Sequence, residues 1–160
     1  MKIVYYCYGG SHSSVTAAAI HLGYLVPDKI PTTDALMRVP LFDTQTDKDH
    51  GKFTLLGQDE MGNEVYTCGC RSLGTKIEKT LHGIAKITNT PMDDVVFVDT
   101  LKGVNNLMRI GGFLSRKLRL VAIGRPIVIK GTLDAFNSFV KIVKEVKEKL
   151  KEDKKGIDIS

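Results

Sequence analysis

The first twenty or so residues constrain the fold of this chain more than any other segment. Residues 3–7 are apolar and rich in β-branched and aromatic side chains, as is typical of a buried strand. Two glycines, Gly9 and Gly10, follow at once, and Ser13 or Ser14 is suited to cap a helix that continues to about Leu22. The pattern predicts a strand, a tight loop and a helix in that order.

The remainder of the chain alternates strands and helices in the same way. Further strands are expected over residues 53–57, 64–68, 95–98 and 120–123, with 127–129 extending the sheet, and helices over about 75–89, 105–117 and from Thr132 onward. The Gly62-Asn63 turn makes the second and third strands an antiparallel hairpin. We therefore predict an α/β three-layer sandwich with a mainly parallel sheet, helices on both faces and one antiparallel hairpin. We expect one domain over residues 1–160, with the last ~10 residues frayed.

Composition favours a cytoplasmic protein. The chain has 160 residues, 42% of them hydrophobic, which is enough for one sizeable core. No apolar run approaches the ~20 residues that span a bilayer, so we expect no membrane partner. The three cysteines form an odd number without a secreted framework pattern, and the N-terminus lacks the pattern of a signal peptide.

The net charge of +5 is unevenly distributed. Residues 100–133 contain seven basic side chains and no acidic one: Lys102, Arg109, Arg116, Lys117, Arg119, Arg125 and Lys130. Such a segment favours a nearby anionic ligand, although acids elsewhere in the chain could also be its partners. Aromatic residues are not interleaved with these charges and no nucleic-acid-binding motif is present, so we expect no nucleic-acid partner.

The loop after the first strand is the best candidate for a ligand site. Ligands of α/β folds bind beyond the carboxyl ends of the strands, where free amides at a helix start attract anions. The sequence predicts that a phosphate-bearing small molecule or a nucleotide binds Gly9, Gly10, Ser11, His12, Ser13 and Ser14. The alternative is a tight turn with a serine cap and no ligand, in an interaction protein without a small-molecule site.

Two further residues could contribute to this site. Arg125 follows the strand expected at 120–123, so it could reach an anion at the first loop, or it could stabilise a surface turn. Asp99 closes the strand at 95–98 and could hold Mg²⁺ that accompanies a nucleotide, or it could cap the next turn.

The loop is similar to two known phosphate-binding loops. It resembles a P-loop, but departs from G-x-x-x-x-G-K-[ST] because it has no second glycine in register and no lysine. It also resembles the phosphocysteine loop of IIB components of sugar phosphotransferase systems, in which a cysteine closes the first strand; Cys7, Gly10, Ser13 and Ser14 match that pattern. This resemblance implies an alternative function, a cysteine-dependent transferase or phosphocarrier that uses Cys7. Cys7 could equally be a buried core thiol, and the roles of Cys68 and Cys70 stay open.

Longer motifs point to one family. Tyr-Tyr-Cys-Tyr-Gly-Gly-Ser-His-Ser-Ser near the N-terminus, Arg-Ile-Gly-Gly-Phe-Leu-Ser-Arg and Gly-Arg-Pro-Ile-Val resemble an uncharacterised family of Gram-positive bacteria, catalogued as domain of unknown function 3189. The resemblance spans roughly residues 1–143. It implies a bacterial cytoplasmic setting and transfers no catalytic role, so whether the chain is an enzyme is left open.

Overall fold

The structure is a computed structural model that describes residues 1–118 and 120–157. Its strands are β1 (Lys2–Cys7), β2 (Phe53–Gln58), β3 (Glu64–Gly69) and β4 (Val95–Asp99). Its α-helices are α1 (Ser13–His21), α2 (Thr33–Met37), α3 (Lys76–Ile87), α4 (Asn106–Gly112), α5 (Val121–Asp134) and α6 (Phe136–Ile157). A π-helical turn, Phe113–Lys117, extends α4. In the part of the chain that is described, no helix is both long and apolar enough to cross a membrane.

The four strands form one mixed sheet in the order β2-β3-β1-β4. β1 is parallel to both of its neighbours, pairing Cys7 with Gly69 of β3 and Tyr6 with Asp99 of β4. β2 is antiparallel to β3, which confirms the predicted hairpin. The carboxyl ends of β1, β3 and β4 therefore meet at one edge of the sheet.

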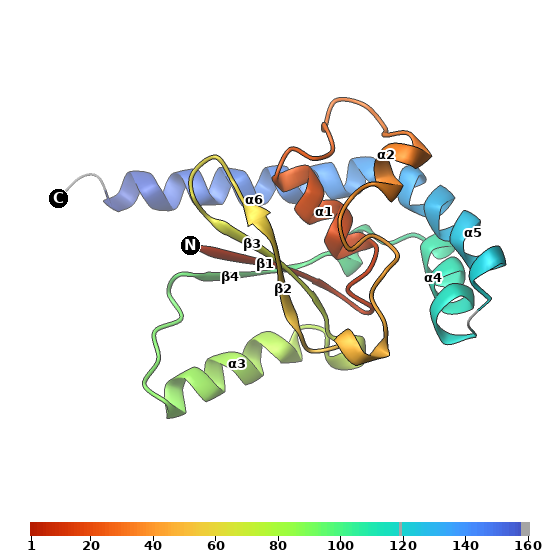
Figure 1. Ribbon diagram of the computed structural model, residues 1–160. Coiled ribbons are helices and arrows are strands. Elements are labelled where there is room, and N and C mark those ends of the chain that lie inside the picture. The colour runs from red at the N-terminus through yellow and green to blue at the C-terminus, as the bar shows by residue number, and fades with distance from the viewer. Residues whose placement is uncertain (119, 158–160) are drawn as a thin grey trace.

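Helices cover both faces of the sheet, and the predicted α/β sandwich is confirmed. In Figure 1, α1 and α6 lie on one face and α3 lies on the other. Alternate residues of β1 supply the two cores, since Ile3 and Tyr5 pack in the cluster beneath α1 and α6. Val4 and Tyr6 pack in the smaller cluster that Ile77 of α3 closes. This alternation is what a strand buried on both faces requires.

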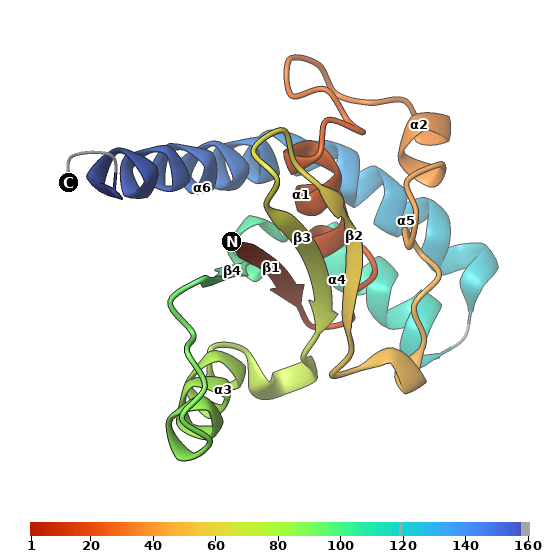
Figure 2. The same cartoon turned by 60° about the vertical axis from the view of Figure 1, so that its left-hand side comes forward.

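The strand predicted at residues 120–123 and its extension at 127–129 are wrong. Leu120 is the N-cap of helix α5, and the rest of both segments lies within that helix, which has Pro126 inside it. The last helix does not begin at Thr132 either, because Thr132 lies within α5, where its hydroxyl donates to the carbonyl of Val128 at 2.8 Å, and α6 begins at Phe136. Figure 2 shows α5 beside α4 in a helical hairpin that projects away from the sheet. Apolar, β-branched runs of this length are ambiguous, since a short buried helix and a buried strand share the pattern.

Candidate functional site

The loop between β1 and α1 lies where the chain changes faces. β1 leads into α1 on one face of the sheet, whereas the neighbouring strand β3 leads toward α3 on the other (Figure 1). Such a switch point is the usual ligand position in open α/β sheets. Backbone bonds join the strand ends here: the Cys70 amide donates to the Cys7 carbonyl at 2.9 Å, and the Arg71 amide donates to the Tyr8 carbonyl at 2.8 Å.

The two glycines of the loop have different surroundings. Gly10 has a φ of +67°, and a Cβ at this position would lie 2.6 Å from the Gly69 amide nitrogen. A side chain is therefore excluded at Gly10 by both conformation and space. Gly9 has no atom within 4 Å of the place where its Cβ would be, so one side of the loop is open.

Cys7 lies on the buried side of the loop. Its side chain is buried, and its Sγ accepts a hydrogen bond from the Gly10 amide at 3.1 Å. The same sulfur lies 3.3 Å from the Ser14 hydroxyl at the start of α1. The loop and the first turn of α1 thus surround the Cys7 thiol. Cys7 is a buried residue that also contacts the candidate site.

The first turn of α1 has no side-chain cap. Its N-cap residue is His12, which makes no side-chain capping hydrogen bond, and the first intrahelical bond runs from the Thr16 amide to the His12 carbonyl. The serine hydroxyls turn inward: Ser13 accepts from the Thr100 hydroxyl at 3.1 Å, and Ser14 contacts Cys7. A ligand of this helix start would therefore be held by backbone amides, whose partial positive charge suits an anion.

Asp43, in the segment between α2 and β2, connects the loop to α5. Asp43 is buried, and its amide donates to the Ser11 carbonyl at 3.0 Å. One carboxylate oxygen lies 3.0 Å from His12 Nε2, and the other accepts from Arg125 Nε at 2.5 Å. Asp43 follows no strand and belongs to no motif, so the sequence carries no signal that would have found it.

Arg125 thus reaches the neighbourhood of the loop for a different reason from the one predicted. It does not follow a strand end but projects from the helix α5, and Asp43 draws it toward His12. The Arg125 side chain stays 44% exposed, so its guanidinium is accessible from solvent. The structure therefore brings Arg125 together with the loop.

Asp99 caps the turn that follows β4. Its Oδ1 accepts from the Leu101 amide at 2.9 Å, which is the alternative that the sequence left open. Within residues 1–118 and 120–157, no group of three or more His, Cys, Asp or Glu side chains is arranged to hold a metal ion. Cys68 and Cys70 are both buried free thiols; burial raises the pKa of Cys68 to about 12 and also raises that of Cys70.

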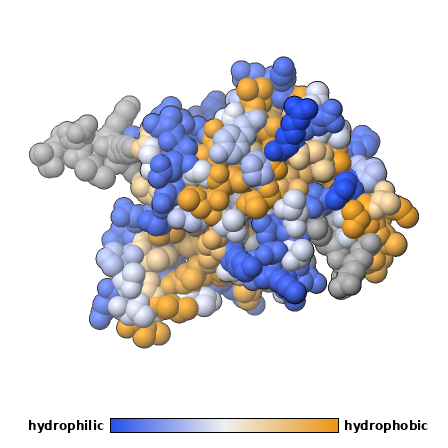
Figure 3. Space-filling view, in the orientation of Figure 1, coloured by the Kyte–Doolittle hydropathy of each residue, from blue (hydrophilic) through white to orange (hydrophobic). Residues whose placement is uncertain are grey.

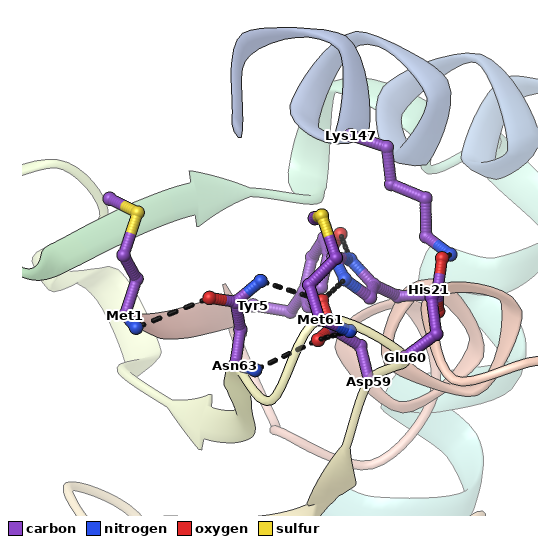
Figure 4. A network of polar contacts seen from close by, with 8 residues as sticks. All are labelled: Met1, Tyr5, His21, Asp59, Glu60, Met61, Asn63 and Lys147. Carbon is purple, nitrogen blue, oxygen red and sulfur yellow. Dashed lines mark hydrogen bonds and ion pairs between the residues drawn. The ribbon is translucent and has the colours of Figure 1, made fainter. Parts of the chain in front are cut away.

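A second polar cluster lies under the opposite edge of the sheet (Figure 4). His21, at the end of α1, contacts the Tyr5 hydroxyl through Nδ1 at 2.7 Å and Asp59 through Nε2 at 3.0 Å. The Asp59 carboxylate also accepts from the amides of Met61 and Asn63 and from the Asn63 side chain. These contacts are satisfied by a neutral imidazole that accepts from Tyr5 and donates to Asp59.

The electrostatics of this cluster favour a structural role. Burial lowers the pKa of His21, although its hydrogen bond with Asp59 acts in the other direction. Burial alone would raise the pKa of Asp59, but the hydrogen bonds from Asn63, His21 and Met61 outweigh it and bring that pKa to about 2. The side chains of His21 and Asp59 are fully buried, so a substrate has no access to them.

Comparison with known proteins identifies the family. No curated protein and no solved structure matches the chain. The family model described as "Protein of unknown function (DUF3189)" matches residues 2–148, which covers β1, the candidate loop and the first 13 of the 22 residues of α6. The chain belongs to the DUF3189 family.

Proposed function

We propose that the loop from Gly9 to Ser14 binds a phosphate-bearing small molecule such as a nucleotide. The observation that carries the proposal is the start of α1, which has no side-chain cap and lies beside the open flank of Gly9. A helix start of this kind attracts anions through its free amides and its dipole. Arg125, held next to the loop by Asp43, would contribute positive charge. His12 contacts the same Asp43 carboxylate and lies at the start of α1.

Magnesium would accompany a nucleotide rather than a simple phosphate. Asp99 closes the strand next to β1, at the same edge of the sheet as the loop, and is the carboxylate that would contact the ion. One of its oxygens already accepts from Leu101, so a single bond to the metal is all that it would offer.

A ligand-dependent melting measurement tests the proposal. Inorganic phosphate or a nucleotide should raise the melting temperature, because a ligand at a hundred times its dissociation constant stabilises a protein by ~2.7 kcal/mol. A Gly9→Val variant should remain folded, since the site of its Cβ is open, but its side chain should obstruct the loop and remove the shift. A broad phosphate and nucleotide screen without any shift in the parent protein would refute the proposal.

Arg125 provides a matched comparison on one helix. Arg125→Ala removes a cation beside the loop and also removes the ion pair that offsets the negative charge of the buried Asp43 carboxylate. Phosphate binding should therefore weaken about tenfold, or ~1.4 kcal/mol. Lys130→Ala, also on α5, removes a charge that is paired with Asp134, and should change phosphate binding little. Equal losses in the two variants would indicate a diffuse electrostatic effect instead of a site.

The surroundings of Cys7 favour a second candidate, a cysteine-dependent transferase or phosphocarrier. The amide of Gly10 and the hydroxyl of Ser14 both lie within hydrogen-bonding distance of the sulfur, an arrangement that could stabilise negative charge on it. Cys7→Ser separates the two candidates. Phosphate-dependent stabilisation should survive in this variant if the loop only binds. The second candidate would be established if the parent protein, incubated with a phosphoryl donor such as acetyl phosphate, gains a phosphoryl group on the Cys7 sulfur while acetate leaves, as detected by mass spectrometry.

A further inference from the structure

The far end of the α4–α5 hairpin is unusually apolar for a surface. Six large hydrophobic side chains between residues 110 and 123 are 37–57% exposed: Ile110, Phe113, Leu118, Leu120, Val121 and Ile123. We call these six residues the hairpin tip. Figure 3 shows hydrophobic residues gathered at the right-hand side of the molecule, where α4 and α5 lie in Figure 1. Exposed apolar residues gathered in this way mark an interaction surface.

The same segment carries charge of one sign. Within residues 109–119 the sequence has Arg109, Arg116, Lys117 and Arg119, and no acidic residue occurs between Thr100 and Leu133. In the sequence the basic residues alternate with leucines, as in Leu118-Arg119-Leu120. A partner of the hairpin tip must therefore be both apolar and negatively charged.

The two helices that carry the tip are closely packed against each other. Gly111 packs directly against the Val128 backbone, and Gly124 packs against Ser115. Near the base, a Cβ on Gly131 would lie 2.6 Å from the Met108 amide nitrogen. These three glycines let α4 and α5 pack closely against each other along the hairpin.

We propose that the hairpin tip is a peripheral binding surface for an anionic lipid membrane. A projecting end of this kind can enter the head-group region, where apolar side chains reach the acyl boundary and basic ones meet lipid phosphates. Such a contact needs no membrane-spanning helix. The proposal differs from the expectation from the sequence that the protein has no membrane partner.

Vesicle sedimentation tests this proposal. The parent protein should sediment with vesicles of phosphatidylcholine and phosphatidylglycerol, but not with phosphatidylcholine alone, and high salt should release it. The double variant Leu118→Ser, Leu120→Ser should bind anionic vesicles at least ~10-fold more weakly, as expected when buried leucine side chains are lost. Arg109→Gln should bind about five-fold more weakly, the equivalent of the ~1 kcal/mol that one basic residue contributes at an anionic surface.

A matched variant on α3 controls for nonspecific binding of vesicles by exposed hydrophobic side chains. Ile84 and Ile87 are 51% and 83% exposed, so the double variant Ile84→Ser, Ile87→Ser should bind vesicles like the parent protein. An equal loss in this variant, or failure of the parent to bind anionic vesicles, would overturn the proposal. Failure on vesicles together with tip-dependent binding of polyglutamate would overturn it in favour of an acidic protein partner.

Discussion

At the scale of single residues, the candidate loop depends on Gly10 more than on its neighbour. Gly10→Ala would place a Cβ against Gly69 at a φ of +67°, whereas Gly9→Ala would add a Cβ in open space. We expect Gly10→Ala to lower the free energy of unfolding by at least ~2 kcal/mol, and Gly9→Ala to change it by less than ~0.5 kcal/mol. Urea unfolding of the two variants measures the difference. Similar stabilities would show that the Gly10–Gly69 contact is absent in solution.

The buried His21 should make the protein sensitive to acid. Folding lowers the pKa of His21 below its ordinary value of 6.5, so the unfolded chain binds a proton more readily than the folded chain does. The free energy of unfolding should therefore fall as the pH drops below 6.5. The loss should not exceed ~1.4 kcal/mol per pH unit for this one group. Asp59, with a folded-state pKa of about 2 against 3.8, should add a second loss below about pH 4.

Denaturant unfolding at several pH values tests this prediction. His21→Gln removes the titrating group, so the variant should be less stable at neutral pH but lose less stability between pH 6.5 and pH 5. His82→Gln, on the exposed side of α3, is the matched control and should behave like the parent protein. A parent protein whose stability is constant across this range would contradict a buried neutral His21.

The residues of the candidate site could be predicted from the sequence only in part. The glycines and serines after β1 are local signals: the structure places the glycines in a loop between a strand and a helix as expected. The prediction that Ser13 or Ser14 caps this helix is wrong, because the N-cap is His12 and both serines lie in the first turn of α1. The inward turn of Ser13 and Ser14 was not predictable, because their partners Thr100 and Cys7 come from different strand ends. The link from His12 through Asp43 to Arg125 joins three distant segments, and no local pattern encodes it.

At the scale of elements, the adjacent glycines of α4 have opposite roles. Gly111 is pressed against the Val128 backbone of α5, whereas a Cβ on Gly112 would meet nothing within 4 Å. Gly112→Ala should therefore raise the free energy of unfolding by up to ~1 kcal/mol through helix propensity alone. Gly111→Ala should lower it by ~2 kcal/mol or more, because the helices must separate. Thermal unfolding shows whether each variant is more or less stable than the parent protein. If both variants are more stable, the close packing of α4 on α5 is contradicted.

Strands and helices with a clear period were predictable, and the hairpin of α4 and α5 was not. β1, β4 and the β2–β3 hairpin are short apolar or alternating runs bounded by turn residues, and α3 follows a helical period. In α5, glycines at 124 and 131 face α4 and interrupt the apolar pattern, so the remaining Leu-Val-Ala-Ile and Ile-Val-Ile runs look like strands. The helical conformation of this segment is set by its packing against α4, and local sequence patterns contain no information about that tertiary contact.

At the scale of the whole molecule, three features occupy different places. The candidate loop lies at the carboxyl edge of the parallel strands, the cluster around His21 lies at the opposite edge, and the hairpin tip projects beside the sheet (Figures 1 and 4). The basic segment 100–133 contributes Arg125 toward the loop and Arg109 toward the hairpin. Phosphate binding at the loop can therefore be measured separately from the binding of anionic vesicles at the hairpin tip.

Amide NMR during a phosphate titration tests the central claim most directly. If the loop binds phosphate, the amide signals of residues 9–14 should shift and saturate, while those of α3 stay in place. The Gly9→Val variant, which fills the open flank of the loop, should show no saturable shift in these amides. Shifts confined to residues 102–130, or no saturable shift anywhere, would contradict the assignment of the loop as the binding site.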